Sequence, residues 1–530
     1  MMHKEAEQLN PNSDRQGIEN FLIPKIMRQL LSLCFLLSPT LWAASTLPPL
    51  PFIQSQYQHL PNSQAIQAYL HKLSEHNPHA RVYTLGYSAG KRPIQGLFIS
   101  NDASFLKSGQ PSSNKLSVLL IGSQHGTEPS GAEAIQALAY SLLAHPQNPL
   151  LNVLNFILIP NGNPDGRDLQ LRGNARHENS NIDYTRLSTP EAQTYVRVLH
   201  QYHPDVVFDL HESSVEKNIL TKKQGYITTV QAQYEVATNP NVSPALHRYA
   251  NKHFLPKLMA KTQAKGLPAT RYTGELFSIH QPIAHGGLRI TNLRNYSGLQ
   301  GSLSVLVENR LDRKHGIYPS PKNIAARIQK QTLSINAFLE TLVEEKQSIL
   351  QVTRKQPTRK SAVLRFAYTL NRYKPQIQLP LEDIHTQHIK NLRFRNYDTV
   401  SVMKTNRLPR AYVILPTAAS SIQPVLDRHF ISYQRFKKTH TLLAMLPKID
   451  HIGIQHPLNP RFRIILMPNV QYHLKHMEIP AGSLYVSCDN NQGLLTTLLL
   501  DPESIDSVYQ STPYKNELLK LPYMDIFPVA

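Results

Sequence analysis

Residues 118–143 read VLLIGSQHGTEPSGAEAIQALAYSLL. The first five residues are apolar and have the length of a buried strand, and residues 130–143 have the length and apolar spacing of a helix. The turn between them holds His125 and Glu128. A strand followed directly by a helix is typical of α/β proteins, in which such turns lie at the carboxyl edge of the sheet.

The same alternation of apolar and amphipathic runs continues from about residue 65 to residue 345. It predicts an α/β domain, which we place at 46–350. The helix at 190–202 has Thr189 and Pro190 at its start, as is typical of a helix N-terminus. Further elements are predicted as strands at 154–160, 205–210 and 303–307 and a closing helix at 324–345.

A polar, basic stretch with a proline, VTRKQPTRKS at 352–361, follows this domain. We place a basic linker at 351–361 and a smaller, β-rich α/β accessory domain at 362–530. One helix is predicted in it, at 419–429. The predicted strands are LRFAYTL (364–370), RAYVIL (410–415), FRIILM (462–467) and SLYVS (483–487).

The composition excludes several classes of protein. The chain has 530 residues, of which 41% are hydrophobic and 17% are charged. These values do not fit a small disulfide scaffold, a disordered chain or a membrane protein with many spans. We therefore expect globular domains with large buried cores.

Residues 29–44, QLLSLCFLLSPTLWAA, form a short apolar segment between Lys25 and Arg28 and a group of small residues. They predict a secretory signal peptide over 1–45, because the segment is shorter than the ~20 residues of a bilayer span. A buried N-terminal helix is the alternative, and Met27 is an alternative start that would make 1–26 an over-long beginning. Cleavage leaves a secreted or periplasmic chain with no transmembrane segment.

His125 and Glu128 are three residues apart, so both side chains can face one point at the sheet edge. His211 follows the predicted strand at 205–210 and emerges at the same edge. A catalytic zinc site uses three ligands of histidine and carboxylate type and leaves a fourth position for water. Each residue alone is more simply explained as a surface or core residue, but together they predict a metal site.

Seven segments in order resemble the zinc metallocarboxypeptidase family, of which carboxypeptidase A is the familiar member. The resemblance implies a mixed, mostly parallel sheet flanked by helices, one zinc ion, and hydrolysis of an amide bond beside a free carboxylate. Residues 362–530 resemble the additional C-terminal domain of some bacterial relatives. The segments are LGYSAGKRPIQGL (85–97), HGTE (125–128), NPDG (163–166), RGNA (172–175), DYTR (183–186), DLH (209–211) and VENR (307–310).

The resemblance also implies roles for individual residues. His125, Glu128 and His211 are expected to be the zinc ligands. Asp183 is expected to accept a hydrogen bond from the first ligand histidine and so fix its tautomer. Glu308 is expected to be the catalytic acid and base that moves the proton of the attacking water.

The remaining roles concern the substrate. Arg172 is expected to stabilise the oxyanion, with Arg176 as an alternative, and Arg186 to bind the substrate carboxylate. Thr185 stands where the family has asparagine, which weakens the expectation of strict C-terminal exopeptidase specificity. Tyr296 is the candidate for the family's mobile tyrosine.

Three functions fit these observations: a metallocarboxypeptidase acting on peptides, an amidase acting on N-acyl amino acids, and a non-catalytic binder of anionic envelope polymers. The formal net charge of +20 is unevenly distributed, since residues 351–450 contain 18 basic and 5 acidic residues. This basic region is the candidate site for an anionic envelope polymer. Nucleic acid is not an expected partner, because the chain has no nucleic-acid-binding motif and a predicted export signal.

Overall fold

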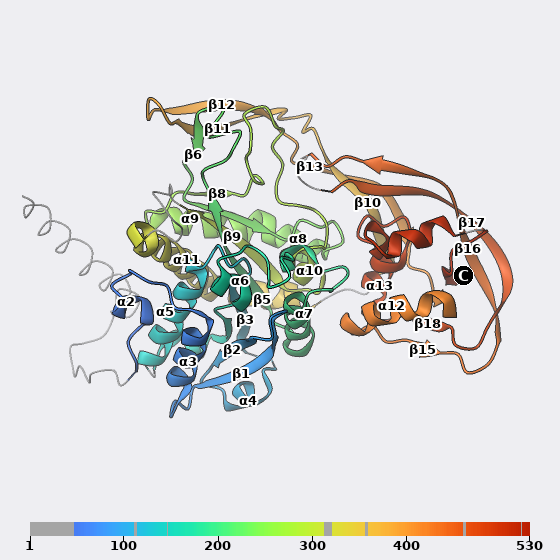
Figure 1. Cartoon of the computed structure of the whole chain (residues 1–530), viewed down its shortest axis with the longest axis horizontal. Helices are drawn as coiled ribbons and strands as arrows, with labels where there is room; N and C mark the ends of the chain where they lie inside the picture. Colours follow the sequence, from blue (N-terminus) through green and yellow to red (C-terminus); the bar gives the residue numbers. More distant parts are fainter. Residues whose placement is uncertain are drawn as a thin grey trace, which may run out of the picture.

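An eight-stranded sheet forms the centre of the N-terminal region in the computed structural model (Figure 1), with strand order β1-β2-β4-β3-β5-β9-β7-β8. The central pairs β4/β3, β3/β5 and β5/β9 are parallel, and three of the outer pairs are antiparallel. The expected mixed, mostly parallel sheet is confirmed. The strands are β1 (Ala80–Tyr87), β2 (Pro93–Ile99), β3 (Leu116–Gly122), β4 (Leu154–Ile159), β5 (Val206–Ser214), β7 (Ala232–Val236), β8 (Ala269–Arg271) and β9 (Leu303–Leu311).

The structure describes residues 47–110, 114–145, 147–311, 321–355, 359–458, 463–520 and 522–529. The predicted signal peptide lies outside these residues.

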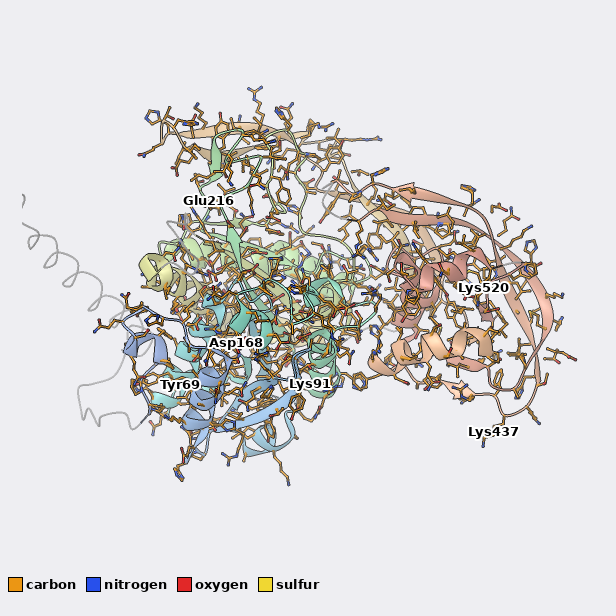
Figure 2. All side chains as sticks on the ribbon, viewed as in Figure 1. Tyr69, Lys91, Asp168, Glu216, Lys437 and Lys520 are labelled. Atoms are coloured by element: carbon orange, nitrogen blue, oxygen red, sulfur yellow. The ribbon has the colours of Figure 1, made fainter. Side chains whose placement is uncertain are left out.

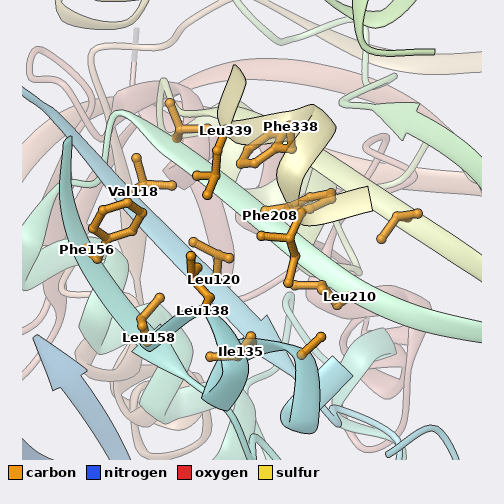
Figure 3. Packing of buried hydrophobic residues seen from close by; sticks show 14 of the residues in the cluster. Val118, Leu120, Ile135, Leu138, Phe156, Leu158, Phe208, Leu210, Phe338 and Leu339 are labelled. Carbon is orange, nitrogen blue, oxygen red and sulfur yellow. The ribbon is translucent and has the colours of Figure 1, made fainter. Parts of the chain in front are cut away.

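Helices cover both faces of the sheet because its central strands are apolar on both sides. All seven residues of β3 are buried. Val118 and Leu120 belong to an apolar cluster that includes helices α3, α5, α9 and α11. Figure 3 shows them with Leu138 of α5 and Leu339 of α11. Leu119 and Ile121 face the opposite side. The first group of helices is α3 (Ser63–Ser74), α5 (Ser130–Ala144), α9 (Leu255–Ala264) and α11 (Pro321–Arg354).

The second face is covered partly by the C-terminal region. Its apolar cluster combines α7 (Pro190–Tyr202) and α10 (Leu293–Leu299) with α12 (Pro416–Arg428) and α13 (Gly493–Leu500). The two regions therefore share one continuous core. Helix α12 corresponds to the helix predicted at 419–429, whereas α13, with the sequence GLLTTLLL, has no polar face from which a helix could be predicted.

The C-terminal region is rich in strands, as predicted. Its six-stranded sheet has the order β15-β18-β14-β19-β16-β17, and a separate pair joins β10 to β13. Helix α11 continues to Arg354, so the beginning of the predicted linker is helical. The strands are β10 (Ser361–Thr369), β13 (Thr399–Arg407), β14 (Ala411–Ile414), β15 (Gln434–Arg435), β16 (His440–Gln455), β17 (Ile465–Ile479), β18 (Leu484–Ser487) and β19 (Ile526–Val529).

A hairpin of the C-terminal region returns to the N-terminal region. Strands β11 (Gln376–Asp383) and β12 (Ile389–Arg395) form this hairpin, and β11 pairs with β6 (Tyr226–Thr228). Beneath it, Leu220, Leu276 and Ile283 form a small apolar cluster with hairpin residues. The hairpin therefore fixes the two loops that contain these residues, 215–225 and 272–292.

Asp501, at the end of α13, should make stability depend on pH. Burial raises the pKa of Asp501 from 3.8 to about 7. Between these values the unfolded chain loses the proton and the folded chain keeps it, so stability falls as pH rises to about 7. At about 1.4 kcal/mol per pKa unit, the stability of Asp501→Asn relative to the unsubstituted protein should increase by about 2–4 kcal/mol from pH 4 to pH 8.

Denaturant titrations of both proteins at the two pH values measure this difference. Asp489→Asn, at an exposed position nearby, is the control and should show no such change. A difference for Asp501→Asn that stays constant between pH 4 and pH 8 would contradict the assignment.

Candidate metal centre

The three predicted ligands meet at the carboxyl edge of the sheet. His125 and Glu128 lie in the turn between β3 and α5, and His211 lies in β5. Nδ1 of His125 is 3.0 Å from Oε1 of Glu128, and Nδ1 of His211 is 2.9 Å from Oε2. All three side chains are buried, and one donor atom from each lies within 4.8 Å of the others.

The N-P-D-G segment shapes the turn that carries the first two ligands. Asn163 caps α6 (Pro164–Leu169) by accepting a hydrogen bond from Gly166 N, and its amide also donates to the carbonyl of Gln124. A Cβ at Gly126 would lie 1.9 Å from the carbonyl carbon of Gly166. Position 126 therefore requires glycine because the two backbone segments touch.

The residues present fit a zinc ion. Nδ1 of His125 is buried and forms no hydrogen bond although it faces Glu128, which is the state expected of a nitrogen reserved for a metal. Burial lowers the pKa of His211, but the carboxylates of Asp209 and Glu128 outweigh it, and the pKa is raised. For His125 the effect of burial dominates and the pKa is lowered, so the carboxylates favour positive charge at the His211 side of the group. Two imidazoles and one carboxylate are a donor set of catalytic zinc.

Asp209 orients His211, and the sequence analysis missed it. Its Oδ1 is 3.0 Å from Nε2 of His211 and accepts a hydrogen bond from the amide of Gln124 at 2.6 Å. The hydroxyl of Tyr184 donates in turn to Gln124. The signal was present in the sequence, because Asp209 and His211 are two apart in a strand and so share a face.

The structure does not bring Asp183 to His125 as expected. Its carboxylate accepts hydrogen bonds from the backbone N–H and hydroxyl of Thr189 at the N-cap of α7, and from Ser188. The backbone N–H groups at the start of α7 have no partners within the helix, and the carboxylate of Asp183 accepts a hydrogen bond there. Nε2 of His125 instead faces Oδ1 of Asn179 at 3.2 Å.

Helix α11 supports the ligands from behind. Arg327, which is 1% exposed, donates two hydrogen bonds to the carboxylate of Glu212 at 2.7 and 2.8 Å. The N–H of Glu212 donates to Glu128, and the amide of Gln331 donates to the carbonyl of His211. Two of the three ligands are therefore held through backbone groups of β5.

Glu308 lies on β9 directly beside His211 of β5 in the parallel ladder, so their side chains share a face. Burial raises the pKa of Glu308 to about 8, and the carboxylate of Glu128 adds to this effect, while His211 and Arg172 oppose it. Nη1 of Arg172 lies 2.5 Å from Oε1 of Glu128. Glu308 and Arg172 therefore bring a carboxyl group that can hold a proton and a cation to the metal group.

The predicted substrate residues Tyr296, Thr185 and Arg186 all contact the C-terminal region. Tyr296 is 2% exposed and its hydroxyl is bonded to His429 of the C-terminal region. Tyr272 follows β8, and burial and the nearby carboxylate of Glu308 raise the pKa of its hydroxyl. Thr185 is buried, and Arg186 contacts Ser188 and the C-terminal region.

Arg172 and Arg176 are both exposed, and the structure places the backbone N–H of Arg176 against Oδ1 of Asn174. Arg172 is therefore the arginine that the described contacts join to the metal group.

A metal group of this composition, with a carboxylate and an arginine beside it at the edge of a mixed sheet, defines a zinc-dependent hydrolase. A family model described as zinc carboxypeptidase matches residues 66–332. The chain belongs to the zinc carboxypeptidase family.

Individual carboxypeptidases are also similar to this chain. Carboxypeptidase 2 of Trichophyton tonsurans is 22% identical over 455 residues, which cover 84% of this chain and 82% of that protein. Carboxypeptidase E of Caenorhabditis elegans is 30% identical over 124 residues, covering 22% and 25%. A metallo-carboxypeptidase structure from Pseudomonas aeruginosa has a TM-score of 0.40 at 20% identity, covering 55% of this chain and 71% of that chain.

Among the helices that the structure describes, none combines the length and apolar character needed to cross a membrane.

Replacing His211 by alanine should remove the metal. The two remaining ligands cannot complete the donor set, so zinc affinity should fall by more than the about 10–100-fold typical of outer-shell changes. Elemental analysis after dialysis measures the zinc content. His247→Ala, outside the metal group on α8 (Pro244–Tyr249), is the control and should keep its zinc. One zinc per chain in the His211→Ala protein would place the third ligand elsewhere.

Proposed function

We propose that this protein is a secreted metallocarboxypeptidase that hydrolyses an amide bond next to a free carboxylate, with peptides as substrates. The observation that carries the proposal is the convergence of His125, Glu128 and His211 beside Glu308. Family membership supports it. The apolar segment at 29–44 supports secretion.

The residues have distinct roles in this proposal. His125, Glu128 and His211 would hold the zinc ion, which supplies Lewis-acid chemistry when bound. Glu308 takes a proton from the attacking water and delivers it to the leaving amine. Burial raises the pKa of its carboxyl above that of a free glutamate, toward the range in which one group can both accept and release a proton.

Arg172 faces the same group and stabilises negative charge that develops on the carbonyl oxygen. The side chain of Arg172 is 57% exposed, and the carboxylates of Glu128 and Glu308 raise the pKa of its guanidinium against the effect of partial burial, so it is a cation beside the metal group. Asp209 and Gln124 keep the imidazole of His211 in one orientation.

An N-acyl amino acid is the alternative substrate, since it too has an amide beside a free carboxylate. The observation that favours it is Thr185 in place of the family's asparagine, which removes one amide donor to that carboxylate. The two substrates differ in their products. Peptides would release a C-terminal amino acid, and N-acyl amino acids would release a free acid.

The test is an assay of the zinc-loaded full chain against peptides and N-acyl amino acids, with and without chelator. We expect chelator-sensitive release of C-terminal amino acids. Glu308→Gln should keep its zinc and lose about 10²–10⁴-fold in kcat, because it removes the proton-transferring group. Release of acids alone would favour the alternative substrate.

Glu216→Gln is the matched control, since Glu216 is exposed (Figure 2) and should leave kcat unchanged. Full activity in the Glu308→Gln protein would contradict the assigned role. Absence of hydrolysis in every zinc-loaded sample would favour a non-catalytic binding protein.

We also propose that the basic region at 351–450 binds an anionic envelope polymer. Its cationic side chains include Lys390 and Arg393 on the β11–β12 hairpin and Lys437 on the far side of the C-terminal region (Figure 2), all exposed. Binding of the full chain to teichoic acid or lipopolysaccharide should weaken at least severalfold between about 50 and 200 mM salt. Equal binding at both salt concentrations, or no binding, would contradict the proposal.

A further inference from the structure

His429, at the C-terminal end of α12, connects the C-terminal region to the predicted substrate segment. Its Nε2 lies 3.0 Å from the carbonyl oxygen of Thr185, and its Nδ1 lies 2.9 Å from the hydroxyl of Tyr296. A carbonyl oxygen can only accept a hydrogen bond, so Nε2 carries the hydrogen. Nδ1 therefore accepts from Tyr296, and both ring nitrogens are paired.

The imidazole of His429 is neutral in this arrangement. The ring is 2% exposed, and burial lowers the pKa of His429 to about 4. A neutral histidine with both nitrogens paired has one tautomer and one orientation. It holds the backbone of Thr185 in place from outside the sheet.

The C-terminal region makes a second contact one residue further along. Nη1 of Arg186 donates to the carbonyl of Thr512 at 3.3 Å, and Nη2 donates to Ser188 at 3.1 Å. The side chain is 33% exposed, with its Nε 3.6 Å from Asp183. A long flexible side chain is thus held at two nitrogens while part of it stays accessible.

We propose that the C-terminal region forms one wall of the subsite for the substrate carboxylate, with His429 and Thr512 positioning Thr185 and Arg186. The inference rests on the proposed function, which gives Arg186 its role. It assigns a role to the C-terminal region within the same active site. His429 is a positioning residue, since it acts through Thr185.

The side of the 183–189 segment that lies toward the metal group is held by contacts that do not involve His429. The hydroxyl of Tyr184 donates to Gln124, which binds Asp209 behind His211. Loss of the His429 contact should therefore affect binding of the carboxylate while the metal group stays intact.

The test compares His429→Leu, which removes both hydrogen bonds, with His429→Gln, whose amide N–H and oxygen can replace them. The substrates are one peptide with a free C-terminal carboxylate and the same peptide as a carboxamide. We expect His429→Leu to raise KM for the free carboxylate about tenfold relative to the carboxamide, with kcat and zinc content nearly unchanged. His429→Gln should restore most of the KM.

His200→Ala is the matched control. The ring of His200 stacks on Phe430 at 4.1 Å across the same interface, and none of the described contacts joins His200 to Thr185. This variant should lose some stability and leave KM unchanged. An unchanged KM in His429→Leu, or equal changes in His429→Leu and His200→Ala, would overturn the proposal.

A readout without activity separates this proposal from the proposed function. Amide hydrogen exchange of the 183–189 segment should be faster in His429→Leu than in the unsubstituted protein and His200→Ala. If neither peptide is hydrolysed, the proposed function fails, and unchanged exchange overturns the contact made by His429. If His429→Leu does not fold, Tyr296→Phe, which removes only the hydrogen bond to Nδ1, should raise exchange in the same direction, and unchanged exchange overturns the proposal.

Discussion

The buried carboxylate of Glu128 is the constraint around which the site is built. Burying a charge is costly unless it is paired, and Glu128 is 5% exposed. Its oxygens face the imidazoles of His125 and His211, the guanidinium of Arg172 and the N–H of Glu212. The loop after β3 and the end of strand β5 must therefore meet to satisfy this one group.

A second buried charge stabilises the first from behind. Glu212 is paired with Arg327 of α11, and its carboxylate also accepts the N–H of Ser130 at the start of α5. Breaking such a buried pair on one side typically costs about 3–5 kcal/mol. The helices on this face of the sheet thus contribute electrostatic support as well as apolar packing.

Sequence patterns predicted the metal ligands, because their positions depend on the sequence of short segments of the chain. The apolar run before Gly122 and the spacing of His125 and Glu128 were sufficient to place two ligands, because strand ends meet at one edge of a parallel sheet. His211 could be predicted for the same reason.

Contacts between distant segments could not be predicted in this way. Asp183 was expected at His125, but the N-terminus of α7 lies nearer and uses its carboxylate. Tyr296 was expected at the substrate, yet its hydroxyl meets His429, 133 residues further along the chain. Nothing near Tyr296 in sequence indicates its partner, whereas the partner of Asp183 is the helix N-terminus at Thr189, only six residues further on, which the sequence had already marked.

The pairing of β6 with β11 has a consequence for folding. The register joins Thr228 to Leu381, so one short edge strand of the N-terminal region finds its partner only after more than a hundred further residues have been made. The sheet face that carries Leu119 and Ile121 is fully covered only when α12 and α13 have also been synthesised. The N-terminal region therefore depends on the C-terminal region to cover one face of its sheet. Most of the chain must be synthesised before the loops beside β6 can adopt their native conformation.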